Sequence, residues 1–122
     1  VVPYMVKANG GCVINTSSVR GLMGSAQQAD YCASKAGLIG MTRALALEFA
    51  KQNIRFNCIC PGMIATDMLR GGDPKAIAEQ VEAVPLGRVG RVEDIADTME
   101  FLIHNQYMTG QYISPNGGNY MP

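Results

Sequence analysis

Three short apolar runs that alternate with helical segments constrain the fold of this sequence more than any other feature. The runs cover residues 12–16, 54–60 and 110–114, and each is bounded by glycine, proline or asparagine. Helical patterns cover residues 29–52 and 92–103, and a shorter helix opens at Asp73-Pro74. Strands that alternate with helices in this way predict a parallel sheet covered by its connecting helices.

The segments between these elements suggest where the rest of the fold lies. Residues 4–8 look like the end of a helix that stops at Asn9-Gly10-Gly11, and a loop containing Gly21 and Gly24 leads into the long helix. A parallel sheet is normally covered on both faces, whereas three strands leave an edge and part of a face open. The pattern therefore suggests that part of the fold is missing and that this part precedes residue 1.

Charge and hydropathy exclude several classes of partner. Ten basic and ten acidic side chains cancel among the 122 residues, so no basic field points to nucleic acid or to an anionic membrane. No apolar run is long enough to span a bilayer, and residues 1–5 lack the pattern of a secretory signal. We therefore expect neither a nucleic-acid nor a membrane partner.

The four cysteines carry no metal-binding spacing. Cys12, Cys32, Cys58 and Cys60 form no Cys-x-x-Cys pair, and His104 is the only histidine. We therefore expect no metal site, and we interpret the cysteines in apolar runs as buried reduced thiols. Such thiols suit the reducing cytoplasm, which is the location we expect.

Tyr31 and Lys35 are the first candidates for chemistry. Their spacing of four residues places both on one face of the long helix, one turn apart. An ammonium beside a phenol stabilises the phenolate, so the pair could exchange a proton with an alcohol or carbonyl oxygen. The same spacing also arises by chance on helix surfaces, so the pair alone is a weak signal.

Ser18 strengthens the interpretation because it ends the first strand. Open α/β sheets bind ligands at the carboxyl ends of their strands, where a hydroxyl could hydrogen-bond a reacting oxygen. Ser17 could take the same role, and either serine could simply belong to the turn. Pro61-Gly62 ends the next strand and Thr66-Asp67 follows, an arrangement typical of close backbone approach to a ligand and also of an ordinary turn.

Together these motifs resemble the short-chain dehydrogenase/reductase family. The resemblance covers nearly the whole chain but only about the last half of a family member, and it rests on Asn15-Thr16-Ser17-Ser18, Tyr31-Cys32-Ala33-Ser34-Lys35, Asn57-Cys58-Ile59-Cys60-Pro61-Gly62, Thr66-Asp67, Pro85-Leu86-Gly87-Arg88, Glu93-Asp94-Ile95-Ala96, Thr109-Gly110-Gln111 and Asn116-Gly117-Gly118. It implies the C-terminal half of a Rossmann-like, doubly wound parallel sheet with flanking helices. Residues 1–122 would be the catalytic and substrate half of one domain, and the dinucleotide-binding half would precede them.

The resemblance implies a role for each matched residue. Tyr31 would be the general acid/base, Lys35 would assist it and hold the nicotinamide ribose, and Ser18 would orient the substrate carbonyl. The cofactor, NADP or NAD, would be held by the Ile64 backbone and the Thr66 side chain at its carboxamide. Further contacts would come from Pro61 and Gly62 beside the nicotinamide ring and from Asn15 near the strand end.

Among subfamilies, the chain most resembles 3-oxoacyl-(acyl carrier protein) reductases of fatty acid biosynthesis. The substrate would be a carbonyl or alcohol, with a 3-oxoacyl thioester on acyl carrier protein as the specific expectation. Basic residues that dock the carrier protein would fall near Asn9 and Gln52, which are neutral, although Lys7 and Lys51 are close by. The alternatives are a hydroxysteroid, sugar or small-alcohol dehydrogenase of the same family, or a non-catalytic fragment.

The long helix also predicts a homo-oligomer. Its apolar residues surround much of its circumference, more than one sheet face can cover, and the resemblance implies a tetramer built on such helices. Met23, Met63, Met68 and Leu69 could line an adaptable substrate pocket or could simply pack. Arg88 and Arg91 are interpreted as structural or solvated, and His104 as a solvated residue or one that faces the dipole at a helix end.

Overall fold

The computed structural model describes the backbone of residues 1–122 and every side chain except that of Met68. Its centre is a parallel sheet in the order β1 (Gly11–Thr16), β2 (Ile54–Ile59), β3 (Tyr112–Ile113). Thr16 pairs with Ile59 and Ile59 with Ile113, so all three strands end at one edge of the sheet. This arrangement confirms the predicted α/β fold with a parallel sheet.

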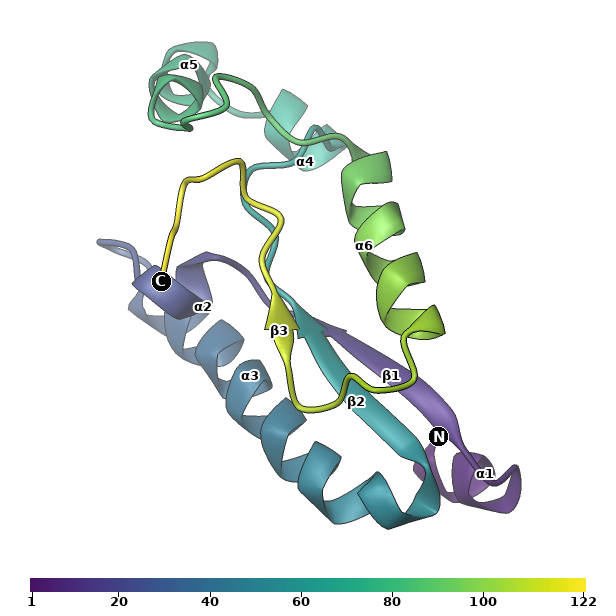
Figure 1. The fold of residues 1–122 in the computed structure, drawn as a ribbon. Coiled ribbons are helices and arrows are strands. Elements are labelled where there is room, and N and C mark those ends of the chain that lie inside the picture. The colour runs from purple at the N-terminus through teal and green to yellow at the C-terminus, as the bar shows by residue number, and fades with distance from the viewer.

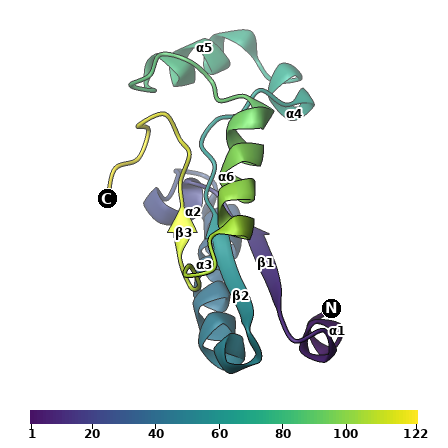
Figure 2. The same cartoon turned by 45° about the vertical axis from the view of Figure 1, so that its right-hand side comes forward.

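Helices cover both faces of the sheet. α3 (Ala29–Phe49) lies along one face and α6 (Val92–His104) lies against the other (Figure 1). α1 (Val2–Lys7) lies beside the amino end of β1, and α4 (Asp67–Arg70) and α5 (Pro74–Glu82) extend beyond the carboxyl ends of the strands (Figures 1 and 2). No helix in the described part of the chain is long and apolar enough to cross a membrane.

β2 forms the centre of the core because its side chains serve both faces alternately. Phe56 and Ile54 pack against Ala46 of α3, and Cys58 packs against Ile39 nearer the carboxyl end. All six residues of β2 are buried, as expected for a strand with neighbours on both edges and helices on both faces.

Polar side chains of β2 attach α6 to the opposite face. The Arg55 guanidinium donates to the carbonyl oxygens of Leu102 and Ile103, both at 2.8 Å. These carbonyls belong to the last turn of α6, where a helix has no internal donors left and where its dipole favours a cation. Asn57 donates from Nδ2 to the Met108 carbonyl at 2.8 Å, which fixes the connection that leads to β3.

Two short helices were not predicted. α2 (Arg20–Met23) occupies the segment expected to be a loop, and α4 was not expected at all. Each has four residues, too few for helical propensity to indicate them, so tertiary contacts must stabilise them. At Gly21, an added Cβ would lie 2.8 Å from the Lys35 carbonyl carbon, so α2 packs directly on the backbone of α3.

The long helix ends close to its predicted boundary. α3 stops at Phe49, and a short 3-10 helix, η1 (Ala50–Gln52), completes the predicted segment. Asn53 then adopts a left-handed conformation with φ 58°, which asparagine tolerates better than most residues. The chain therefore reverses at Asn53 and enters β2, as the sequence predicted.

Candidate functional site

The candidate site lies where the carboxyl ends of the three strands meet. Ser17 donates its N–H to the Ile59 carbonyl at 2.8 Å, and Val19 donates to the Pro61 carbonyl at 3.0 Å. On the other side, the N–H of Gly62 donates to the Pro115 carbonyl at 3.0 Å. The sheet pairing thus continues past the strands and holds the three connecting loops against one another.

The two candidate serines have different partners. Ser17 donates its hydroxyl to the carbonyl of Lys35 at 2.7 Å and so ties the end of β1 to α3. Ser18 is buried, accepts the backbone N–H of Arg20 at 3.1 Å on its Oγ, and lines a cleft. Because Ser17 is occupied in joining two elements, the geometry favours Ser18 as the serine available to a ligand.

Lys35 and Tyr31 lie together at the start of α3. Lys35 donates from Nζ to the Thr16 carbonyl at 3.0 Å, so the ammonium is held at the end of β1. The same Nζ lies 5.7 Å from the centroid of the Tyr31 ring, within range of a cation–π contact. Tyr31 as a whole is 42% exposed.

The loop after β2 combines a close backbone approach with polar groups that do not bond to the neighbouring backbone. At Gly62, an added Cβ would lie 2.8 Å from Asn116 Cα, so only glycine allows this close approach. Ala65 donates to the Gly90 carbonyl at 2.8 Å, whereas within the described residues the Ile64 N–H has no backbone acceptor. Thr66 precedes α4 without capping it through its side chain, which leaves its hydroxyl free of that helix.

Asn15 faces α3 rather than the edge of the sheet. Its Nδ2 donates to the Thr42 hydroxyl at 2.9 Å, and that hydroxyl donates to the Leu38 carbonyl at 2.7 Å. Through these hydrogen bonds, the Asn15 side chain joins β1 to α3. Its expected place near a cofactor remains a prediction.

A cleft of about 310 Å³ opens beside Ser18. It is lined by Ser18, Val19, Arg20, Met23, Gly62, Met63, Leu69, Gln80, Ala83 and Asn119. Three of the four residues that the sequence suggested for a pocket, Met23, Met63 and Leu69, thus line it, and the side chain of Met68 lies outside the described residues. Sequence reasoning missed Arg20, Gln80 and Asn119, because no motif links three segments so far apart.

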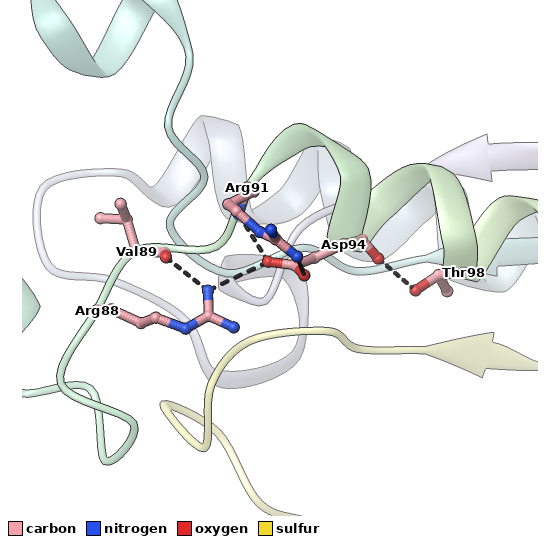
Figure 3. Close-up of polar contacts among 5 residues, drawn as sticks. All are labelled: Arg88, Val89, Arg91, Asp94 and Thr98. Carbon is pink, nitrogen blue, oxygen red and sulfur yellow. Dashed lines mark hydrogen bonds and ion pairs between the residues drawn. The ribbon is translucent and has the colours of Figure 1, made fainter.

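Arg88 and Arg91 form a polar cluster with Asp94 beside a smaller cavity of about 210 Å³ (Figure 3). Asp94 accepts the backbone N–H of Arg91 at 2.7 Å and the guanidinium of Arg88 at 3.2 Å. The backbone N–H of Arg91 and then the two guanidinium groups lower the pKa of Asp94 to about 2. The cluster holds the start of α6, in agreement with the structural role expected for both arginines.

Neither the cysteines nor the histidine is among the described residues that line the cleft. All four cysteines are free thiols, and Cys58 and Cys60 are buried. The hydrogen bond shared with Cys58, together with burial, raises the pKa of the Cys60 thiol. His104 lies exposed at the end of α6 with Nδ1 3.0 Å from the Glu100 carbonyl, and the described residues contain no cluster of metal-ligating side chains.

Comparisons with known proteins agree on one family. The family model described as Enoyl-(Acyl carrier protein) reductase matches residues 1–119. The chain is 48% identical over 120 residues to the 3-oxoacyl-[acyl-carrier-protein] reductase of Chlamydia muridarum, covering 97% of this chain and 48% of that protein. It is 46% identical over 113 residues to carbonyl reductase family member 4 of Danio rerio, covering 91% of this chain and 46% of that protein.

A solved structure agrees with the fold. The crystal structure of 3-oxoacyl-[acyl-carrier protein] reductase from Brucella melitensis superposes with a TM-score of 0.93 at 40% identity. The match covers 99% of this chain and 46% of that one. The chain therefore spans about half the length of the relatives it matches.

Proposed function

The chain belongs to the short-chain dehydrogenase/reductase family, and on that premise we propose that the complete protein transfers hydride between a nicotinamide cofactor and a carbonyl or secondary alcohol. The observation that carries this proposal is the convergence of Ser18, Tyr31 and Lys35 at the carboxyl edge of the sheet. A nicotinamide cofactor supplies the hydride, so the protein must supply a proton and hold the carbonyl in place.

Each of the three side chains has a role that follows from its position. The Tyr31 hydroxyl donates the proton to the carbonyl oxygen as that oxygen gains charge. Lys35, held by the Thr16 carbonyl, places a positive charge beside the phenol and stabilises the phenolate that remains. Ser18 donates its hydroxyl to the same carbonyl oxygen and orients it toward Tyr31.

The residues at the edge of the sheet fit a nicotinamide cofactor, NADP or NAD. The free Ile64 N–H and the Thr66 hydroxyl would hold the carboxamide, and Pro61 and Gly62 would border the ring. Lys35 would also reach the ribose. Asn15, the residue before Thr16 in β1, would lie near the cofactor. The choice between NADP and NAD belongs, in this proposal, to residues that precede residue 1.

We propose that residues 1–122 are the C-terminal half of a single Rossmann-like domain. β1 lies at the edge of the sheet, and five of its six residues are only half-buried, which fits a strand that takes a further neighbour. The pyrophosphate of a dinucleotide is held by a glycine-rich turn and a helix N-terminus early in such a fold. The cofactor site would therefore be completed by the preceding half.

The substrate we propose is a 3-oxoacyl thioester carried on acyl carrier protein. The relatives named as 3-oxoacyl-[acyl-carrier-protein] reductases support this substrate, and the Met and Leu side chains of the cleft would accept an alkyl chain. Lys7 and Lys51 would dock the acidic carrier. Lys7 precedes the turn at Asn9 and Lys51 precedes the turn at Asn53. These two turns are in contact, because Asn53 donates from Nδ2 to the Asn9 carbonyl at 3.3 Å.

The assembly we propose is a homotetramer in the cytoplasm. Only three residues of α3 are buried, whereas Met41 and Leu47 are exposed, so this helix has an apolar face available for its own copy. The free thiols fit a reducing compartment. Light scattering of the complete protein should give a tetramer, and a monomer would contradict this part of the proposal.

The decisive experiment follows nicotinamide absorbance in the complete protein. We expect NADPH or NADH to be oxidised in the presence of acetoacetyl thioesters, with a lower KM when the thioester is borne on acyl carrier protein. An equal KM for free and carrier-borne thioesters would remove the docking role of Lys7 and Lys51. Activity only on a hydroxysteroid, sugar or small alcohol would move the protein to another branch of the family, and no activity on any carbonyl would contradict the proposal.

A further inference from the structure

Arg20 carries the only positive charge among the described residues that line the larger cleft, and no carboxylate lines it. Arg20 is half-buried, and none of the ion pairs among the described residues includes it. Its guanidinium donates from Nη1 to the Ser25 hydroxyl at 3.1 Å. A guanidinium has five N–H donors, and the described residues supply a partner for one of them, the Ser25 hydroxyl.

The position of Arg20 ties it to the proposed reaction centre. Its backbone N–H donates to Ser18 Oγ at 3.1 Å, and the preceding residue, Val19, donates to the Pro61 carbonyl at 3.0 Å. The Ser25 contact restrains the far end of the side chain in the same way. Arg20 is therefore a restrained cation two residues after the serine proposed to orient the substrate carbonyl.

We propose that Arg20 determines substrate specificity by binding a second acyl oxygen, two carbons from the carbonyl that is reduced. This inference rests on the proposed carbonyl reductase function and deepens it. A half-buried cation without a carboxylate partner favours an electron-rich oxygen, and hydrogen bonds to charged groups are stronger than those between neutral groups. A 3-oxoacyl compound supplies that oxygen as a thioester carbonyl or as a free carboxylate, whereas a simple ketone supplies none.

The test uses the complete protein and three carbonyl substrates. Acetoacetyl-CoA carries the second oxygen as a thioester, acetoacetate carries it as a carboxylate, and decalone has a single oxygen. The variants are Arg20→Met, Arg20→Lys and, as a matched control, Lys75→Met, which removes an exposed positive charge from α5 outside the cleft. Steady-state kcat/KM is measured for every pair.

In Arg20→Met, the ratio of kcat/KM for acetoacetyl-CoA to that for decalone should fall about 10- to 100-fold, as expected for loss of a hydrogen bond from a charged donor. Arg20→Lys should recover part of this ratio, and Lys75→Met should leave it within about twofold. A larger fall for acetoacetate than for the thioester would identify the carboxylate as the favoured source of the oxygen, and the reverse would identify the thioester.

Other results would overturn the inference. If Arg20→Met lowers activity on acetoacetyl-CoA and decalone equally, Arg20 only supports the fold near Ser18. If Arg20→Met fails to fold, the Arg20→Lys ratio decides the question, and an unchanged ratio contradicts acyl-oxygen binding that depends on the guanidinium. A wild-type protein that reduces decalone but neither acetoacetyl compound contradicts the inference alone, whereas one that reduces none of the three contradicts the proposed function.

Discussion

β1 and β2 run side by side with equal length, yet their surroundings differ. All six residues of β2 are buried, whereas β1 has five half-buried residues and one exposed residue. β2 has a strand on each edge, and β1 has β2 alone. β1 leads into Ser17 and Ser18, and its last residue, Thr16, accepts a hydrogen bond from the Lys35 ammonium. The candidate catalytic side chains therefore lie at the end of the strand that is less completely packed.

The residues that hold the fold together and the candidate catalytic residues therefore occupy neighbouring but separate parts of this chain. β2 holds α3 through Phe56 and α6 through Arg55, and it needs no further element to do so. The end of β1 presents its polar groups at an open edge, where a further part of the protein and a ligand would both be placed. Substitutions in the two parts should therefore have separable effects on activity and on stability.

Tyr31→Phe should have the largest effect and should leave the fold unchanged. The substitution removes one oxygen from an exposed helix residue, so the free energy of unfolding should change by less than about 0.5 kcal/mol. Loss of the proton donor should lower kcat/KM of the complete protein by about 1000-fold or more. A variant that keeps a tenth of the wild-type rate would remove Tyr31 from the proton transfer.

A matched pair of substitutions compares the two strands directly. Ile59→Ala in β2 should lower the free energy of unfolding by about 4 kcal/mol, because Ile59 is fully buried. Ile14→Ala in β1 should cost nearly as much in the complete protein, since we propose that the preceding half covers β1 there. Urea unfolding measures both, and a cost below about 1 kcal/mol for Ile14→Ala would indicate that β1 stays open.

Lys35→Met should weaken both catalysis and cofactor binding. One ammonium serves the phenol and the ribose in our account, so kcat/KM should fall about 100-fold and the cofactor Kd should rise about tenfold. Lys75→Met should change neither value. Unchanged cofactor affinity in Lys35→Met would mean that Lys35 does not bind the ribose and acts only on the Tyr31 phenol.

The smallest effect concerns Asp94, at the start of α6. Its pKa is lowered to about 2, so the stability it contributes is fully present above the ordinary carboxyl pKa of about 4 and is lost as the pH falls toward 2. The difference in Tm between the wild type and Asp94→Asn should therefore be largest above pH 4 and should shrink toward pH 2. A difference that does not depend on pH would mean that the ion pairs with Arg88 and Arg91 add nothing.

The sequence predicted the sheet, the long helices and the proximity of Tyr31 to Lys35 because each depends on spacing within one segment. Tyr31 and Lys35 are one helical turn apart, and Ser18 directly follows a strand, so local pattern suffices for both. The hydrogen bond from the Arg55 guanidinium to the Leu102 carbonyl, in the last turn of α6, joins residues 47 positions apart. No local pattern indicates such a contact, and the buried arginine of β2 was therefore not predicted.

The cleft beside Ser18 could be predicted only in part for the same reason. Met63 lies in the loop after β2 and Leu69 in α4, and their place near a substrate followed from the resemblance. Gln80 and Asn119 reach the cleft only because α5 and the C-terminal loop fold over the ends of the strands. Arg20 lies in the short helix α2, which the sequence indicated as a loop, so its position beside Ser18 became apparent only in the structure.

We propose that this chain carries the proton-transfer groups but depends on a preceding half to hold the cofactor. The most direct test expresses residues 1–122 alone beside the complete protein and titrates both with NADH and NADPH, following nicotinamide fluorescence. We expect saturable binding by the complete protein and none by residues 1–122, which should also aggregate through the open edge of β1. Micromolar binding, or measurable reduction of an acetoacetyl substrate, by residues 1–122 alone would contradict the claim and would show that the site is contained within this half.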